Sequence, residues 1–468
     1  MTHSPTPKDK SPEEFAAIKV DKHALWGKQT QRSLNYFDIG KQSFDLDFIH
    51  ALVSIKRASA QVNQEHGLLS AEQYAVIVSA CDDLLRGEYS DQFPLRIWQT
   101  GSGTQTNMNV NEVIATLANR QLNDIKLKDG SIHPNDHVNC SQSSNDVFPS
   151  AMHLVVAQKT HQKLLPAIEQ IQQALSLKRD EFNESYTVGR THMMDALPIR
   201  AGAVLSGYCH QMSAAQNAIN ESLKAVYQLA LGGTAVGSGA NTPNLFGQKA
   251  IAMLAEHYQL PFVQHPNLYA AVSGEDALVR YSSALKQLAA ALLKIANDFR
   301  MLGSGPRCGF NEWHLPANEP GSSIMPGKVN PTQCEALSMV CLQVFGNDLT
   351  VSLAGSNGQL QLNTYRPVII HNVMESIELL SDTIGSFSTN CVEGLTLNRK
   401  QLEVNMHNNL SVITLLAPTI GYEVATKIAR AADRENISLA QAAESLKLYD
   451  HEEFEALLQK QLRAHLSE

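Results

Sequence analysis

The most regular pattern of apolar residues in this chain runs from residue 278 to residue 302. Its apolar positions follow one another in alternating steps of three and four residues: Leu278, Tyr281, Leu285, Leu288, Leu292, Ile295, Phe299 and Leu302. Residues three and four apart lie on one face of an α-helix, so this spacing predicts a long helix with a single apolar seam, packed at a shallow angle. Similar long patterns cover about 147–182, 199–230, 331–355 and 366–390. Helices of this length are expected to form bundles that pair with bundles of other subunits.

Segments rich in Gly, Ser, Thr and Asn interrupt the helical patterns, and few segments predict β-strands. These expected loops cover 100–109, 130–146, 187–198, 231–247 and 303–331. A chain of 468 residues is expected to form two or three domains. We therefore predict an all-α fold of three helical domains, the central one an elongated long-helix bundle. The predicted parts are a flexible leader at 1–18, an N-terminal helical domain at 19–142, the central bundle at 143–396 and a small C-terminal helical domain at 397–468.

Composition and charge narrow the class of protein. The 37 basic and 46 acidic residues give a net charge of −9 with no basic tract, which argues against a nucleic-acid partner. The polar N-terminus lacks the apolar region of a secretory signal, and the uncharged stretch Ala225–Gln248 is too rich in Gly, Asn and Pro for a membrane helix. Seven scattered cysteines without a Cys-x-x-Cys pair indicate reduced, mostly buried thiols. We expect a cytoplasmic protein with no membrane partner.

Three loops share an unusual composition of hydroxyls, amides and backbone N–H groups. They read "GSGTQTNMNVNE" from Gly101, "HPNDHVNCSQSSND" from His133 and "GSSIMPGKVNP" from Gly321. At least two lead into helical patterns, where unpaired N–H groups and the helix dipole favour an anion. Helix capping alone explains one such loop. Three loops, each more polar than a cap requires, favour a small oxyanion ligand.

Two alternative sites do not fit the spacing. A P-loop has four residues between its first glycine and Gly-Lys, followed by Ser or Thr. Five residues separate Gly321 from Gly327, and Val329 follows Lys328. His133 and His137 have the four-residue spacing of a zincin, but Pro134 interrupts the helix that such a pair needs and the zincin Glu is missing. We expect neither a nucleotide site nor a metal site.

Two titratable residues are candidates for proton transfer. The segment "GRTHMMDALP" contains His192, and Glu335 follows Lys328 by seven residues in the first turn of an expected helix. A carboxylate can raise the basicity of a nearby histidine. A lone loop histidine is more often structural, and the helix dipole favours an acid in a first turn. Spacing does not show that the two residues meet.

Together these motifs resemble the class II fumarate hydratases of the fumarase/aspartase superfamily. The resemblance rests on "GSGTQTNMNVNE", "HPNDHVNCSQSSNDVFP", "GRTH..DA.P" and "GSSIMPGKVNPTQCEA", supported by "LWGKQTQRS" and "LGGTAVGSGANT". It extends from about Leu25 to the mid-400s. The Gly-Ser-Ser-x-x-Pro-x-Lys-x-Asn loop marks the superfamily, and the Gly-Lys-Val-Asn-Pro-Thr-Gln version resembles fumarases more than aspartases.

The resemblance implies reversible, stereospecific hydration of fumarate to L-malate without a metal or other cofactor. It also implies a homotetramer whose central helices form one bundle, with each active site shared between three subunits. The loop at 321–331 would be a mobile flap. By the resemblance, the catalytic residues are His192, Ser322, Glu335 and Lys328. The substrate-binding residues are Ser102, Gly103, Thr104, Ser143, Ser144, Asn145, Thr191, Ser323, Lys328, Val329 and Asn330. A second dicarboxylate site would comprise His133, Pro134, Asn135 and Asp136.

The implied chemistry needs these groups. Removing a proton next to a carboxylate creates an enediolate-like dianion, whose charge must be met by donors placed in advance and by a cation such as Lys328. His192, supported by Glu335, would activate water for hydration, and Ser322 would exchange the proton at the neighbouring carbon. Flap closure would exclude water.

One position departs from the family pattern. The family usually has Thr-His-x-Gln-Asp-Ala, and Met194 occupies the place of the Gln. Three alternatives therefore stay open. They are an ammonia lyase acting on L-aspartate, a hydratase of methylated fumarate, and a structural helical bundle without catalysis. The last is argued against by the joint presence of Ser322, Lys328, Asn330, His192 and Glu335.

Overall fold

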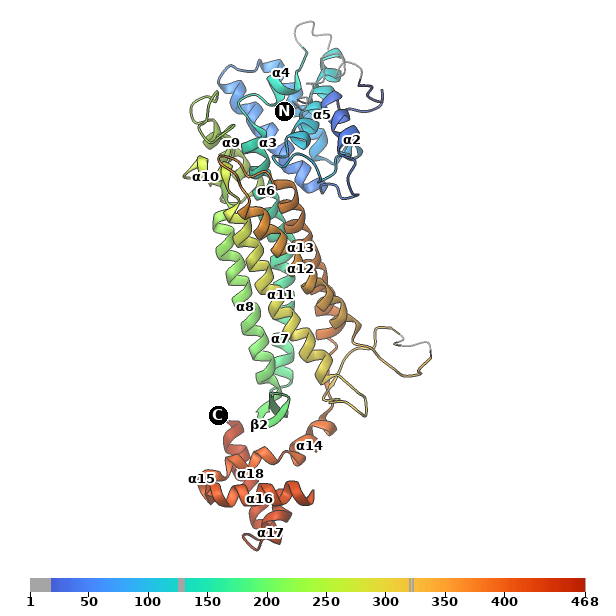
Figure 1. Ribbon diagram of the computed structural model, residues 1–468, viewed down its shortest axis with the longest axis vertical. Helices are drawn as coiled ribbons and strands as arrows, with labels where there is room; N and C mark the ends of the chain where they lie inside the picture. Colours follow the sequence, from blue (N-terminus) through green and yellow to red (C-terminus); the bar gives the residue numbers. More distant parts are fainter. Residues whose placement is uncertain (1–17, 125–130, 320, 322–323, 468) are drawn as a thin grey trace, which may run out of the picture. The chain divides into compact units, whose positions relative to one another are not determined.

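The computed structural model describes residues 18–124, 131–319, 321 and 324–467. Within these residues the fold is all-α, as predicted, and the only sheets are three short two-stranded ones (Figure 1). The chain divides into two compact units, which we call the first and second units. The first contains the described residues of Met1–Leu165, Asn217–Gln287 and Gln343–Leu379; the second contains those of Pro166–Gln216, Leu288–Leu342 and Leu380–Glu468.

Most helices of the first unit are of moderate length. They are α2 (Lys28–Tyr36), α3 (Leu46–Glu65), α4 (Ala71–Leu85), α5 (Thr104–Asp124), α6 (Ser144–Lys159), α9 (Phe246–Tyr258) and α10 (Leu268–Ser273), with short turns η1 (Ser90–Gln92), η2 (Pro134–Val138) and η3 (Thr160–Leu164). Strands β3 (Gln228–Leu229) and β4 (Val263–Gln264) pair in parallel. Helices α3 and α6 meet through the rings of Phe48 and Phe148, whose centroids lie 4.9 Å apart. This buried contact sets the position of α6, which carries several predicted site residues.

The second unit contains the hairpin strands and the C-terminal helices. Its elements are β1 (Tyr186–Thr191), β2 (Met194–Arg200), β5 (Trp313–His314), η4 (Ser388–Val392), β6 (Thr396–Leu397), α14 (Arg399–Asn408), η5 (Leu410–Leu415), α15 (Ala417–Ile420), α16 (Tyr422–Glu435), α17 (Leu439–Ser445) and α18 (His451–Ser467). Helix α7 (Leu165–Glu181) begins at the boundary between the units. Four long helices have residues in both units: α8 (Ala201–Val226), α11 (Asp276–Leu302), α12 (Thr332–Ser356) and α13 (Arg366–Phe387).

The predicted apolar seam of 278–302 is confirmed in α11. Its seam residues from Leu278 to Phe299 are buried, and only Leu302, the last residue of the helix, is partly exposed. The other long patterns also form helices. The pattern at 147–182 becomes α6, the π-helical turn η3 and α7 in succession. The apolar spacing therefore located the long helices correctly.

The segment 187–198, which we expected to be a loop, is instead most of a β-hairpin. Strands β1 and β2 pair antiparallel from Tyr186 opposite Arg200 to Thr191 opposite Met194. The prediction was wrong because few apolar side chains mark these strands. Their stability comes from pairing with each other and from contacts to distant segments.

The C-terminal residues have a small apolar core of their own. It runs from Val412 to Leu458 and includes the fully buried Leu416, Ile428 and Phe454. Such a core is what an independent C-terminal helical domain needs. The division into three domains stays a prediction.

Helix α12 carries a stripe of exposed apolar side chains. Met339, Leu342, Leu349 and Leu353 are 57–65% exposed in the single chain, and their spacing places them on one face. The opposite face buries Asn347 and Asp348. In the part of the chain that the structure describes, α12 alone is long and apolar enough to cross a membrane by length and composition, with 33% of its apolar window buried. The buried amide and carboxylate instead favour a helix packed against protein.

Candidate active site

Two of the three predicted polar loops come together in the first unit. Ser143 caps helix α6: its Oγ accepts a hydrogen bond from the N–H of Asn145 at 3.2 Å, and its own N–H donates to the carboxylate of Asp146 at 2.9 Å. The hydroxyls of Thr104 and Ser144 are hydrogen-bonded at 2.7 Å. The starts of α5 and α6 therefore lie together, and the positive ends of two helix dipoles at one place suit an anion.

The turn at 101–104 is tightly packed. Ser102 and Thr104 share a hydrogen bond of 2.7 Å between their hydroxyls. Gly103 has φ +74°, and a Cβ there would lie 2.1 Å from the ring of Phe148. Only glycine fits both the conformation and the space. Six predicted substrate-binding residues thus lie in two joined turns, 102–104 and 143–145.

Asp146 is a structural residue of this site that the sequence reasoning did not single out. Its carboxylate is fully buried and accepts hydrogen bonds from the N–H groups of Gly232 and Thr234 at 3.0 and 2.9 Å. Burial raises the pKa of Asp146, and the backbone donors oppose that rise. The side-chain amide of Asn145 also donates to the carbonyl of Ala235 at 2.8 Å. The segment "LGGTAVGSGANT" therefore supports the start of α6, and its glycine-rich composition was the available signal.

Lys56 lies beneath the loop that begins at His133, and the sequence did not indicate its role. Its fully buried ammonium donates to Asn139 Oδ1 at 2.8 Å and to Gln142 Oε1 at 3.0 Å. Burial lowers the pKa of Lys56 to about 7, an effect that the charge of Asp146 opposes. A lone lysine in the helical pattern of α3 has no sequence signal for this role.

The predicted second dicarboxylate residues form one surface turn of the first unit. His133 precedes the π-helical turn η2, and its Nδ1 accepts a hydrogen bond from the N–H of Asp136 at 3.1 Å. Its own N–H donates to His137 Nδ1 at 2.8 Å. His133 lies outside the turn that Pro134 begins, so the two histidines do not share a regular α-helix. Among the described residues no group of three or more His, Cys, Asp and Glu side chains could hold a metal ion.

His192 stands at the tip of the hairpin in the second unit. His192 and Met193 form the two-residue turn with φ +54° and +65°, while Thr191 and Met194 are the last paired residues of the strands. This left-handed conformation suits a tight hairpin turn but is uncommon for residues other than glycine, asparagine and aspartate. His192, Thr191 and Met194 are all exposed in the single chain.

A buried carboxylate anchors the hairpin. Glu312 accepts hydrogen bonds from Arg190 Nη2 at 2.6 Å, Thr187 Oγ1 at 3.1 Å and Asn405 Nδ2 at 2.7 Å. The guanidinium of Arg190 also lies 4.7 Å from the centre of the Phe310 ring. Glu312 therefore joins β1 to α14 and restrains the strand that ends beside His192. His192 lines a pocket of about 540 Å³ next to this anchor.

The third predicted loop lies in the second unit. Lys328, Val329, Asn330 and Glu335 line one pocket of about 1150 Å³. Asn330 Nδ2 donates to the carbonyl of Gly321 at 2.6 Å, which closes the base of the loop. Glu335 lies in the first turn of α12, as predicted. Ser322 and Ser323 lie outside the described residues.

The predicted catalytic and substrate-binding residues that the structure describes therefore form three groups. The joined turns belong to the first unit; the hairpin tip and the 321–331 loop belong to the second. His192 and Glu335 line different pockets of the chain, and their pairing stays a prediction.

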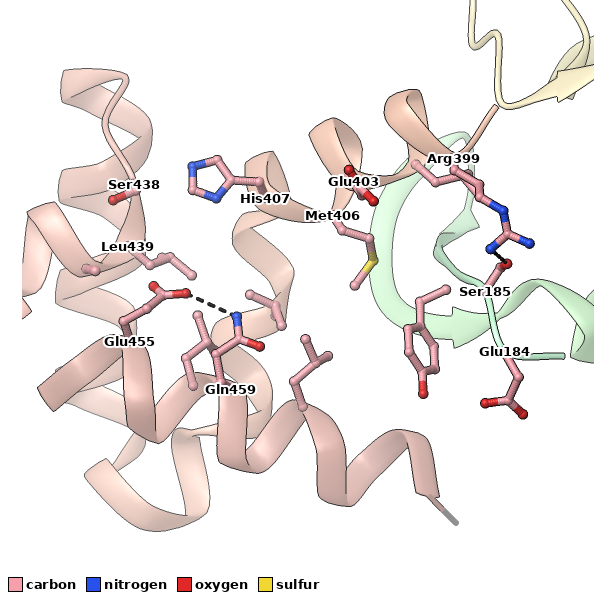
Figure 2. A pocket seen from close by; sticks show the side chains of 16 residues that line it. Glu184, Ser185, Arg399, Glu403, Met406, His407, Ser438, Leu439, Glu455 and Gln459 are labelled. Atoms are coloured by element: carbon pink, nitrogen blue, oxygen red, sulfur yellow. Dashed lines mark hydrogen bonds between the residues drawn. The ribbon is translucent and has the colours of Figure 1, made fainter. Parts of the chain in front are cut away.

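Another pocket of the second unit, of about 370 Å³, contains none of the predicted residues (Figure 2). It lies between the start of β1 and helices α14, α17 and α18, and Arg399 at its edge donates to Ser185 Oγ at 2.9 Å. Its lining mixes leucines with Glu403, His407 and Glu455. No pair of loops rich in amides and hydroxyls faces this pocket, so it is a weaker candidate for the anion site.

Comparisons with known proteins decide the family. Residues 16–346 match the family model described as "Lyase", and residues 412–462 match "Fumarase C C-terminus". The chain is 50% identical to the class II fumarate hydratase of Thermosynechococcus vestitus, with 96% of each chain covered. It is also 50% identical to that of Pseudomonas putida, over 95% of this chain and 96% of the relative. The chain belongs to the class II fumarate hydratase family.

Solved structures agree with this membership. A class II fumarase from Schistosoma mansoni superposes with a TM-score of 0.90 at 41% identity, covering 94% of this chain and 95% of that one. A fumarate lyase:delta crystallin from Brucella melitensis, bound to cobalt, superposes with a TM-score of 0.89 at 36% identity, covering 95% and 96%. The resemblance found in the motifs is confirmed, and so is the all-α fold of the fumarase family.

Proposed function

We propose that this protein catalyses the reversible, stereospecific hydration of fumarate to L-malate. The observation that carries the proposal is the pair of joined turns, where hydroxyls of Thr104 and Ser144 and the amide of Asn145 meet at two helix N-termini. Neutral donors at helix N-termini suit a carboxylate, despite the net charge of −9 on the chain. The relatives named class II fumarate hydratase support the choice of substrate.

In the mechanism we propose, one carboxylate of the substrate binds the joined turns. Lys328 and Asn330 bind the carboxylate on which the dianion develops. In the dehydration direction, the Ser322 alkoxide takes the proton from the carbon next to that carboxylate. The electron pair of the C–H bond moves onto the carboxylate, forming an enediolate-like dianion that the donors and the ammonium stabilise. Collapse of the dianion forms the double bond and expels the hydroxyl group, which leaves as water after accepting a proton from His192. Hydration is the reverse sequence.

The active site is shared between three subunits of a homotetramer. Two observations support this. The stripe of Met339, Leu342, Leu349 and Leu353 on α12 leaves a continuous apolar face exposed in the single chain, which other copies would cover. The predicted catalytic residues also belong to the second unit, whereas most predicted substrate-binding residues belong to the first, so assembly of several copies would complete each site.

The proposed chemistry uses hydroxyl, amide, ammonium and imidazole groups of the chain itself, and it needs no cofactor. The proposed location is the cytoplasm. The seven cysteines, of which four are buried, are free thiols, as a reducing compartment would keep them.

A single parallel assay tests the function. The ultraviolet absorbance of the unsaturated product is followed with L-malate, L-aspartate and citramalate as separate substrates, and the loss of that absorbance is followed with fumarate. Turnover of L-malate and fumarate is expected. Turnover of L-aspartate alone would instead identify an ammonia lyase, and no turnover of any substrate would revive the non-catalytic bundle.

The hydratase of methylated fumarate is the second candidate, and one observation favours it. Met193 and Met194 at the hairpin tip are 56% and 69% exposed beside His192. An apolar side chain there would tolerate a methyl group on the substrate better than an amide would. A kcat/KM for citramalate above that for L-malate would establish this candidate, and Met194→Gln should then reverse the preference.

A further inference from the structure

Arg366, the first residue of α13, is among the largest fully buried side chains in the described part of the chain. A buried guanidinium carries five N–H donors and a positive charge. It is stable only where acceptors bind the donors and a negative charge lies nearby. Nε donates to Glu275 Oε1 at 2.6 Å, and Nη2 donates to the carbonyl of Val272 at 2.6 Å. Glu275 is itself buried and supplies the opposite charge.

The third contact of Arg366 reaches the candidate active site. Nη1 donates to the backbone carbonyl of Asn145 at 2.8 Å. In an α-helix this carbonyl would accept from the N–H four residues later, but residue 149 is proline, which has no N–H. Arg366 therefore supplies the donor that Pro149 cannot. The proline ring also crowds the same carbonyl, so without Arg366 that partly buried acceptor would have no partner in its helix.

The backbone of Arg366 holds the other substrate-binding turn. Its N–H donates to the carbonyl of Gly101 at 3.1 Å. Gly101 also packs so closely on this segment that a Cβ would lie 1.4 Å from the carbonyl oxygen of Thr364. One residue of α13 is thus bonded to both turns, and the Thr104–Ser144 hydrogen bond links the turns on their other side.

We propose that Arg366 is a positioning residue of the dicarboxylate site, which sets the spacing of the two anion-binding turns through Asn145 and Gly101. It does not touch the substrate, because its side chain is fully buried. The proposal rests on the proposed function, since it assigns the joined turns to a substrate carboxylate. The proposal therefore predicts that substrate affinity depends on the planar guanidinium of Arg366, which bonds three acceptors at once.

The experiment compares wild type, Arg366→Lys, Pro149→Ala and the double variant in fumarate hydration. Lysine keeps the charge opposite Glu275 but cannot bond three acceptors in a planar fork. Arg366→Lys should raise KM about tenfold or more, with a smaller change in kcat. Pro149→Ala restores an N–H for the carbonyl of Asn145. The double variant should therefore have a KM closer to wild type than Arg366→Lys has.

Two controls separate positioning from stability. Glu275→Gln keeps an acceptor for Nε and the bond to Asn145 while removing a buried charge. It should lower the melting temperature without the tenfold rise in KM. Arg57→Lys alters an arginine of the same unit that pairs with Asp82 on the surface, and it should leave KM unchanged.

Several results would overturn the proposal. They are a KM for Arg366→Lys within twofold of wild type, a double variant with the full defect, and KM changes that merely follow the melting temperatures. If Arg366→Lys does not fold by itself, the double variant is compared with the Pro149→Ala single variant, which keeps Arg366. A tenfold rise of KM there would equally contradict the role through Asn145. A wild type without turnover would refute the proposed function instead, so the two failures are distinguishable.

Discussion

Replacing Lys56 with methionine should change how the stability of the protein depends on pH. Burial lowers the pKa of Lys56 from 10.5 to about 7 in the folded protein, while Asp146 and Cys81 act in the opposite direction. Between these values the folded protein has released a proton that the unfolded chain still binds. The unfolded state then binds more protons, so this lysine makes the protein more stable as pH rises through that window. Below about pH 7 both states are protonated, and the full cost of the buried charge is present.

The size of this change in stability follows from the pKa shift of Lys56. One proton contributes about 1.4 kcal/mol per pH unit between the two pKa values. From pH 7 to pH 8.5 the wild type should therefore gain about 2 kcal/mol relative to Lys56→Met. The lost hydrogen bonds to Asn139 and Gln142 add an offset that does not change with pH.

The assay is urea unfolding of both proteins at several values from pH 7 to pH 9. All other titrating groups are common to the two chains, so the difference between their unfolding free energies isolates Lys56. Replacement of the exposed Lys22 serves as the reference for loss of a surface lysine. A difference that stays constant across the range would refute the reasoning. It would mean that Lys56 keeps its proton and that water or local opening reaches the site.

The remaining predictions concern the site, the assembly and cofactors. His192→Asn should lower kcat by about 10²-fold or more, because it removes the proposed proton donor and acceptor; near-normal kcat would exclude that role. Leu349→Lys places a charge on the exposed apolar stripe of α12 and should dissociate the oligomer in sedimentation velocity. An unchanged sedimentation coefficient would show that the stripe is not an interface. Activity should persist in excess EDTA, and a loss that divalent metal restores would contradict the cofactor-free mechanism.

Local patterns were sufficient to predict the long helices. The seam of α11 depends on neighbours within a few residues, so spacing identifies it. Helix α6 instead begins at Ser144, inside the loop expected at 130–146. The motifs that resemble fumarases are also contiguous in the sequence. Ser322 was predicted in the same way, although it lies outside the described residues.

The supporting residues could not be predicted in this way. Arg366 bonds to a carbonyl 221 positions away, and Glu312 joins Thr187 to Asn405. The hairpin at 186–200 was missed because its strands are stabilised by pairing and by Glu312, not by a local apolar pattern. Such partners are chosen by proximity in space, which leaves no regular spacing in the chain.

The amino-acid sequence alone determined the all-α class, the polar loops and the family, because helix periodicity and contiguous motifs depend on short-range order. Only the tertiary structure showed that Thr104 meets Ser144 and that Asp146 and Lys56 are buried near them. It also showed that Arg366 donates a hydrogen bond to the carbonyl of Asn145, for which Pro149 has no N–H. The physical reason is the cost of burying polar groups. Each such group needs a partner, and that partner is whichever segment the packed helices bring within hydrogen-bonding distance.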